Sequence, residues 1–439
     1  MYLKLAFRNA KRSVSDYLLY IFSMAVLVAV MCISNCLANW GEMQAGFQTA
    51  SLPLLIVIIM VLLTDYLNTF IVKQRAKEFA TYMLLGMERD KLALTFLGEL
   101  SMIGVLCFIL GAVSGTGIFL MSVRIFLQGA GGRALSGITG KSALQTFLYF
   151  CSGEVLSILF MRHKLYRLQI VRLMQEKRRN QPLRKGKPGS LFWGIVFLAG
   201  FLLYLLLLCA VSFLPEKIMA AAISVISIPV LLCVCSFYKW MYVLFVSLRL
   251  SKAEGLYRGS RLYRIAALTA ESGTGAKMNA VFCICLIFSA ASFVSGRIFI
   301  HPEVHIFERA QQQWMGFLQM GICVIFMVIY FSTLSLLQIV DLRREAGNRR
   351  LLFYMGRNRS QCRALLCAQI LVKLLLPTLM ACILSGTALP FVNARVNSVL
   401  PAGASDLLLR VGSEFMLFFA GMYLCYFCVM YLVLHPARN

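Results

Sequence analysis

The sequence predicts an all-α integral membrane protein that crosses the bilayer about ten times. Its 439 residues are 60% hydrophobic and only 14% charged, and the mean hydropathy is +0.79. Soluble domains are about 45–50% apolar and about 25% charged, so these values exclude a soluble globular fold. Runs of about 20 apolar residues, the length that a spanning helix needs, recur along the whole chain.

The fourth predicted span is the weakest because Glu154 lies inside it, and an acidic residue at a helix centre costs about 2.5–3.5 kcal/mol on insertion scales. Its length still favours a span. The ten predicted spans are residues 17–38, 51–72, 99–122, 143–161, 190–212, 217–238, 278–299, 314–338, 366–389 and 411–434.

The formal net charge of +25 indicates orientation. If both termini are cytoplasmic, 34 of the 43 Lys and Arg lie in cytoplasmic segments and 8 in outer loops, as the positive-inside rule requires. Anionic lipid at the inner face of the plasma membrane would add to the attraction. Nucleic acid is not an expected partner, because no basic stretch is interleaved with aromatic residues on a soluble module.

Most of the 15 Cys lie inside the apolar runs, which is typical of packed thiols. The outer loops contain none, so a disulfide framework is not expected. The first apolar run is longer than the core of a signal peptide. Residues 2–12 form either an amphipathic helix at the inner interface or a charged flank of the first span, and both interpretations stay open.

Two cytoplasmic segments combine charge with apolar residues that insertion does not require. Residues 73–91, KQRAKEFATYMLLGMERDK, have helical apolar spacing that breaks at Gly86. Residues 338–363 repeat the arrangement 270 positions later, with Gly356 matching Gly86. These hairpins are predicted to dock a cytoplasmic partner, and packing against neighbouring loops is the alternative.

The repeat predicts two related units, as is common among transporters. Met355 also matches Leu85, and Gln369 matches Glu99. The predicted organisation is an N-terminal helix and first span, a first permease-like unit, a linker with central spans, and a second permease-like unit. Their bounds are residues 1–50, 51–180, 181–300 and 301–439.

No catalytic constellation stands out, so neither an enzyme nor a bound cofactor or metal is expected. The TGKS at residues 139–142 lacks the earlier glycine of a phosphate-binding loop. His301 and His305 are close in sequence, with Glu303 and Glu308 nearby, but a solvated outer loop explains them better than a metal site does.

Polar groups inside spans are stronger candidates, because an ionisable group in the membrane must be paired or face a cavity. Asp65 shares a helix face with Asn68 and Thr69, so that face is predicted to point into the protein. Glu99, Lys373 and Glu414 could instead lie at span ends and reach the interface. The full set of candidates is Asp65, Asn68, Glu99, Glu154, Lys373 and Glu414. In the third span, Gly111 and Gly115 form a small-residue pair that predicts close helix packing.

These motifs resemble the FtsX-like permease family, and within it the permeases of bacitracin-resistance ABC transporters. The opening LAFRNAKRSVSDYLLYIFS is similar to the start of such permeases. Residues 68–104, NTFIVKQRAKEFATYMLLGMERDKLALTFLGELSMIG, resemble their most recognisable stretch, and LLFYMGRNRSQ resembles their later half. The large extracellular domain of those permeases is absent, because only residues 300–313 separate the seventh and eighth spans.

The resemblance implies a permease without catalytic activity that moves a hydrophobic or amphipathic compound, such as a peptide antibiotic or a lipid. A separate ATPase subunit, as a dimer, would bind ATP and dock on the hairpins, and membrane lipid and a sensor histidine kinase are further implied partners. The implied coupling residues are Lys77, Glu78, Phe79, Leu84, Gly86 and Met87 in the first hairpin, and Arg349, Arg350, Tyr354 and Gly356 in the second.

Two alternatives belong to other functional classes. An ATPase-driven signalling scaffold without net transport would use the same hairpins, although short outer loops argue against an external enzyme partner. An ion-coupled secondary transporter is disfavoured because the acidic residues within spans are few and the hairpins would be unexplained.

Overall fold

The structure is a computed structural model. It describes residues 14–39, 56–62, 64–65, 68, 71–72, 75–126, 132–166, 189–213, 216–250, 261, 264–265, 272–302, 309–356, 358–399 and 407–434. All regular secondary structure in these residues is helical, which confirms the predicted all-α class. The predictions for residues 2–12, Thr69, Glu303, His305 and Glu308 lie outside them.

Eight helices in the described part of the chain are long and apolar enough to cross a membrane. Tyr20–Cys36 is a shorter apolar stretch at the first predicted span, and the second predicted span is described only in pieces. The total of about ten therefore stays a prediction. The eight are Asp90–Met121, Thr139–His163, Leu191–Ala210, Ile228–Leu250, Gly275–Ile300, Gln319–Ile339, Ser360–Ala394 and Leu407–Leu432.

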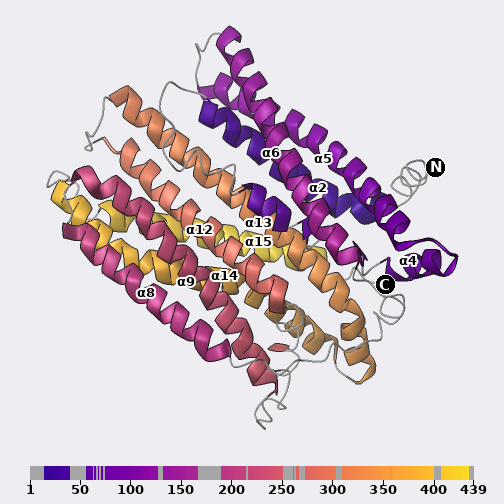
Figure 1. Ribbon diagram of the computed structural model, residues 1–439. Helices are drawn as coiled ribbons and strands as arrows, with labels where there is room; N and C mark the ends of the chain where they lie inside the picture. Colours follow the sequence, from indigo (N-terminus) through magenta and orange to yellow (C-terminus); the bar gives the residue numbers. More distant parts are fainter. Residues whose placement is uncertain are drawn as a thin grey trace. The chain divides into compact units, whose positions relative to one another are not determined.

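The chain divides into two compact units, Met1–Gln181 and Pro182–Asn439. The four-part organisation predicted from sequence stays a prediction. The first unit contains α2 (Val14–Asn39), α4 (Ala76–Leu84), α5 (Arg89–Phe126) and α6 (Gly132–Tyr166). Helix α2 packs along both α5 and α6, which also contact each other (Figure 1).

Glycines on α5 let α2 approach closely. A Cβ at Gly111 would lie 2.6 Å from the Val28 Cβ and 2.7 Å from the Ala25 carbonyl oxygen. One at Gly115 would lie 2.6 Å from the Ala29 carbonyl oxygen. The predicted small-residue pair is therefore a packing surface, and it brings the two helix backbones together.

Hydrogen bonds between amides and hydroxyls fix α2 against α6. Asn35 Nδ2 donates to Thr146 Oγ1 at 2.9 Å, and both residues are buried. Near the end of α2, Asn39 Nδ2 lies within hydrogen-bonding distance of Ser142 Oγ, at 2.9 Å, and of Gln145 Oε1, at 2.7 Å. Interhelical hydrogen bonds of this kind specify register where lipid offers no hydrophobic driving force between helices.

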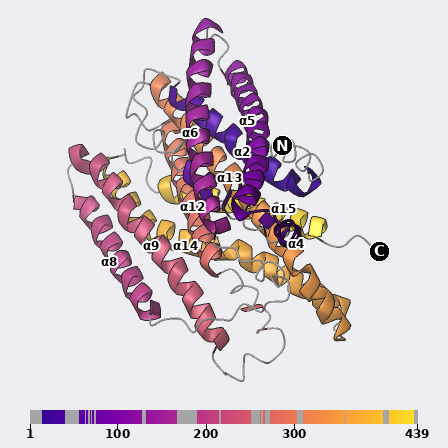
Figure 2. The same cartoon turned by 45° about the vertical axis from the view of Figure 1, so that its right-hand side comes forward.

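The second unit is arranged around α12, which packs on α9, α13, α14 and α15. Helices α8 and α9 lie side by side in both views (Figure 2), and α8 also contacts α14. The bounds are α8 Gly189–Phe213, α9 Glu216–Leu250, α12 Ser272–Ile300, α13 Arg309–Tyr354, α14 Arg359–Val399 and α15 Leu407–Leu434.

Tyrosine hydroxyls surround a proline in α14. Pro377 has no N–H, so the carbonyl one turn earlier loses its helical donor. Tyr238 of α9 donates to the carbonyls of residues 376 and 377 at 3.1 and 3.0 Å, and Tyr423 of α15 donates to that of residue 374 at 3.2 Å. These bonds tie α9 and α15 to α14 close to Pro377, although their acceptors differ from the carbonyl of residue 373, which loses its helical donor.

The close packing of α2 on α5 yields a stability prediction. Gly111→Ala places a methyl group against the α2 backbone, so we expect it to lower the free energy of unfolding by about 1–3 kcal/mol. Gly117→Ala is the matched control, because it lies on the same helix with no atom within 4 Å of its Cβ position. Thermal unfolding in detergent compares the two, and equal midpoints would contradict the packing argument.

Candidate functional site

The first hairpin turns at Gly86 with the backbone that the sequence predicted. Helix α4 ends at Leu84, and Gly86 has φ +93°, a left-handed conformation that glycine adopts without steric cost. The Gly86 N–H donates to the Met83 carbonyl, and the Met87 N–H donates to the Tyr82 carbonyl. These two bonds form a Schellman motif, which ends the helix and reverses the chain into α5.

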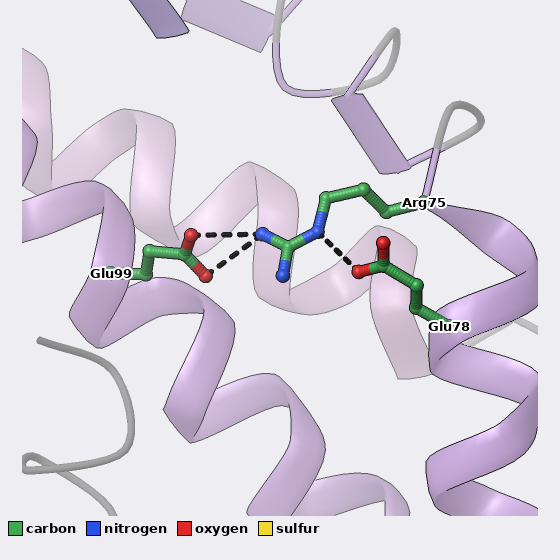
Figure 3. A network of polar contacts seen from close by, with 3 residues as sticks. All are labelled: Arg75, Glu78 and Glu99. Atoms are coloured by element: carbon green, nitrogen blue, oxygen red, sulfur yellow. Dashed lines mark hydrogen bonds and ion pairs between the residues drawn. The ribbon is translucent and has the colours of Figure 1, made fainter. Parts of the chain in front are cut away.

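A buried ion pair joins the two arms of this hairpin (Figure 3). Arg75 Nη1 lies 2.8 and 3.0 Å from the two carboxylate oxygens of Glu99, and their side chains are 9% and 2% exposed. Arg75 Nε donates to the more exposed Glu78 at 2.8 Å. We call the pair of Arg75 and Glu99 the first clamp. Removing one partner of such a pair costs about 3–5 kcal/mol, because the other charge stays buried.

An aromatic contact supports the first clamp from inside the hairpin. Phe79 packs edge-on against Phe96, with ring centroids 5.3 Å apart, and the Arg75 guanidinium carbon lies 5.6 Å from the centre of the Phe79 ring. A small pocket opens between these side chains. Phe79 is buried, so it shapes the hairpin rather than presenting a surface to another protein.

The tip of the first hairpin presents apolar side chains outward. Leu85 is 80% exposed, Leu84 is also exposed, and Met87 is half-buried. The side chain of Lys77 lies outside the description. Leu84 and Leu85 thus form the accessible apolar part of the predicted coupling element, which we call the first tip.

The second hairpin repeats this design. Helix α13 ends at Tyr354, Gly356 has φ +90°, and the Met355 N–H donates to the Leu351 carbonyl. Tyr354 and Met355, the second tip, are 79% and 74% exposed. The predicted contacts Arg349 and Arg350 lie on α13, and only their backbone is described.

The second hairpin has its own ion pair, with the charges reversed. Asp341 of α13 pairs with Lys373 of α14, and we call this pair the second clamp. In the first clamp the base precedes the turn, whereas in the second the acid precedes it. With the 270-residue offset, each second-clamp residue lies four positions, about one helical turn, farther from the turn than its counterpart in the first clamp.

The other polar candidates are distributed over both units. Asn68 is buried, as predicted, and Asp65 is half-buried. In the second unit, Glu414 pairs with Arg297 of α12 at 2.9 Å between exposed side chains. Glu154 lies on α6 and packs against Gly104 of α5. A Cβ atom added to Gly104 would lie 3.2 Å from the Glu154 Oε1 atom.

Sequence reasoning selected one member of each of three ion pairs between helical segments and missed the other. Its expectation for Glu99, Lys373 and Glu414 was either a mechanistic role or a place at the interface, and the structure gives each an interhelical partner. The missed partners are Arg75, Asp341 and Arg297. Their signal was present as single opposite charges on neighbouring segments, but helix register decides which of these meet.

Exchange of the first clamp's charges should distinguish an ion pair from two independent polar contacts. We expect Arg75→Glu and Glu99→Arg each to lower the free energy of unfolding by about 3–5 kcal/mol. The double variant should recover part of this loss, because it has the charge order of the second clamp.

Addition of Glu78→Gln should improve the recovery, since Glu78 would otherwise repel the new glutamate. Thermal unfolding of the purified chain measures each step, with Glu78→Gln alone as the control. Additive losses in the double variant would rule out a specific pairing of Arg75 with Glu99.

Comparison with known proteins places the first hairpin in a recognisable segment. Residues 50–161 match the profile of the FtsX-like permease C-terminal family. The chain is 26% identical over 180 residues to the bacitracin export permease protein BceB of Bacillus subtilis (strain 168). That match covers 38% of this chain and 27% of BceB.

The matched family segment contains the first clamp and the first tip, and the spans around it form a multi-pass helical membrane protein. The resemblance that the sequence predicted is thereby confirmed: the chain is similar to the FtsX-like permeases, and its residues 50–161 carry their characteristic segment.

Proposed function

We propose that this chain is the membrane-spanning subunit of an ABC transporter, powered by a separate ATPase. The observation that carries the proposal is the pair of similar turns. Each has a left-handed glycine, exposed apolar residues at its tip and an ion pair between the helices on either side. Apolar side chains exposed on a tight turn are typical of surfaces that another protein covers.

The clamps give the proposal a mechanical basis. A force applied to the first tip reaches Glu99, and therefore the spanning part of α5, through Arg75. A force on the second tip reaches α14 through Asp341 and Lys373. Because a buried ion pair resists separation, each hairpin moves with the helix that follows it.

The substrate that suits this arrangement is a hydrophobic or amphipathic compound, such as a peptide antibiotic or a lipid. BceB is described as a bacitracin export permease, but the chain spans only 27% of its length. Helices α12 and α13 are separated by only eight residues, 301–308, which leaves no room there for a large external domain. We therefore propose that the substrate enters from within the bilayer.

We further propose a plasma-membrane location with both termini in the cytoplasm, a dimer of the ATPase that alone binds ATP, and a sensor histidine kinase as an accessory partner. The basic residues favour this orientation through the positive-inside rule. The orientation places both tips on the side where ATP is available.

Docking of the ATPase is tested with variants of both tips. Leu85→Ser combined with Met355→Ser should reduce the amount of co-expressed ATPase that co-purifies with the chain by tenfold or more, because each change removes a buried apolar contact of about 1.5–3 kcal/mol. Leu94→Ser is the matched control, since Leu94 is exposed on α5 away from the turn. Full retention of the ATPase by the tip variant would reject this docking surface.

Orientation has its own test. A membrane-impermeant maleimide should label Leu85→Cys and Met355→Cys only after the cells are permeabilised, because both tips are proposed to face the cytoplasm. The unsubstituted chain gives the background from its native cysteines. Labelling of either tip in intact cells would overturn both the orientation and the ATPase proposal.

A further inference from the structure

Glu154 differs from Glu99 and Glu414, two other acidic residues of the predicted spans. Glu99 is bound by Arg75, and Glu414 by Arg297. The Glu154 Oε1 atom is buried and receives no hydrogen bond from any residue in the described parts of the chain. A buried acceptor without a donor costs about 1–3 kcal/mol, and more if it is charged, so an unsatisfied group of this kind requires an explanation.

The surroundings of Glu154 form a notch between α5 and α6. Gly104 makes the notch, because a Cβ there would lie 3.2 Å from Oε1 and 3.3 Å from the carboxyl carbon. The neighbouring Gly153 accommodates the Met60 side chain, whose Cε would lie 2.1 Å from a Cβ at that position. The missing side chain at Gly104 thus leaves room for the carboxyl group, and the missing side chain at Gly153 leaves room for Met60.

The Oε1 atom is covered, but Glu154 as a whole is partly exposed on one side. Glu154 is half-buried and lies at the edge of the buried stripe of α6, between Phe150 and Ser157. The adjoining surface of α6 consists of exposed apolar side chains, among them Val155 and Leu159. In a spanning helix such a surface contacts hydrocarbon chains.

From this geometry we propose that the notch of Glu154 and Gly104 binds the ammonium group of a primary-amine amphiphile that enters from the bilayer. The carboxylate supplies the negative charge, and an ammonium group supplies an N–H donor to the carboxyl group, whose Oε1 atom receives none from the described residues. The hydrocarbon chain of the ligand lies along the exposed apolar surface of α6. In a region of low dielectric, a cation brought by the ligand interacts with this carboxylate more strongly than it would in water.

The inference deepens the proposed function by naming the headgroup chemistry of its substrate. Binding needs neither the ATPase nor the hairpin tips, so it can fail while the ATPase still docks, and the reverse is also possible. The two proposals therefore have separate tests.

The test uses the purified full-length chain in nanodiscs of phosphatidylcholine. The probe is dodecylamine carrying a photoreactive diazirine, and the matched neutral probe is the corresponding dodecanol. The amine should label peptides of α5 and α6 around Gly104 and Glu154 saturably, and unlabelled dodecylamine should compete. The alcohol should label the same surface weakly and without saturation.

Two variants locate the contact. Glu154→Gln keeps the shape of the side chain and should raise the amine concentration needed for half-maximal labelling by tenfold or more. Gly104→Val fills the notch and should have a similar effect, with Gly117→Ala as the control on the same helix. Size-exclusion profiles verify that each variant is folded.

Unchanged saturable labelling of Glu154→Gln would overturn the inference. So would saturable labelling by the neutral alcohol with the same concentration dependence as the amine, because the site would then recognise the alkyl chain alone. A folded Gly104→Val variant that still binds the amine normally would remove the notch from the explanation.

Discussion

The interaction on which the hairpin architecture depends is the buried pair of Arg75 and Glu99. A charge held away from water has a large desolvation cost, and it is tolerated only when an opposite charge and hydrogen bonds compensate for it. Here one guanidinium binds both carboxylate oxygens of Glu99 and also reaches Glu78. The start of α4 is thereby tied to α5, because separating the pair would cost the buried Glu99 carboxylate both of its hydrogen bonds to this guanidinium.

The two arms of the second hairpin are also linked by an ion pair, but its charges are reversed. Asp341 and Lys373 reverse the charge order and lie one helical turn farther from their turn. The two turns themselves remain alike, with φ values of +93° and +90° at their glycines. The two hairpins therefore share a left-handed turn and an ion pair between their arms. They differ in which arm carries the basic residue and in how far the ion pair lies from the turn.

Around Pro377 the second unit uses neutral hydrogen bonds rather than charges. Tyr238 and Tyr423 donate to α14 carbonyls around Pro377, and Tyr204 of α8 donates to the Leu384 carbonyl at 2.8 Å. Helices α8, α9 and α15 thus each form hydrogen bonds with α14 at a different position along its length. Side chains of neighbouring helices thus donate to carbonyls of α14 close to Pro377, a residue that has no backbone N–H of its own.

The sequence by itself determined the fold class, most of the spans, the two glycine turns and the packing of Gly111 and Gly115. These follow from properties of one segment at a time: hydrophobic length, helical spacing, and residues that alone adopt positive φ. It also selected Glu99 and Lys373 as functional candidates, but not their partners. Only the tertiary structure decided those pairings, the inward position of Phe79 and the isolation of the Glu154 Oε1 atom. The physical reason is that contacts between helices depend on their relative rotation and register, and apolar composition leaves both undetermined in lipid.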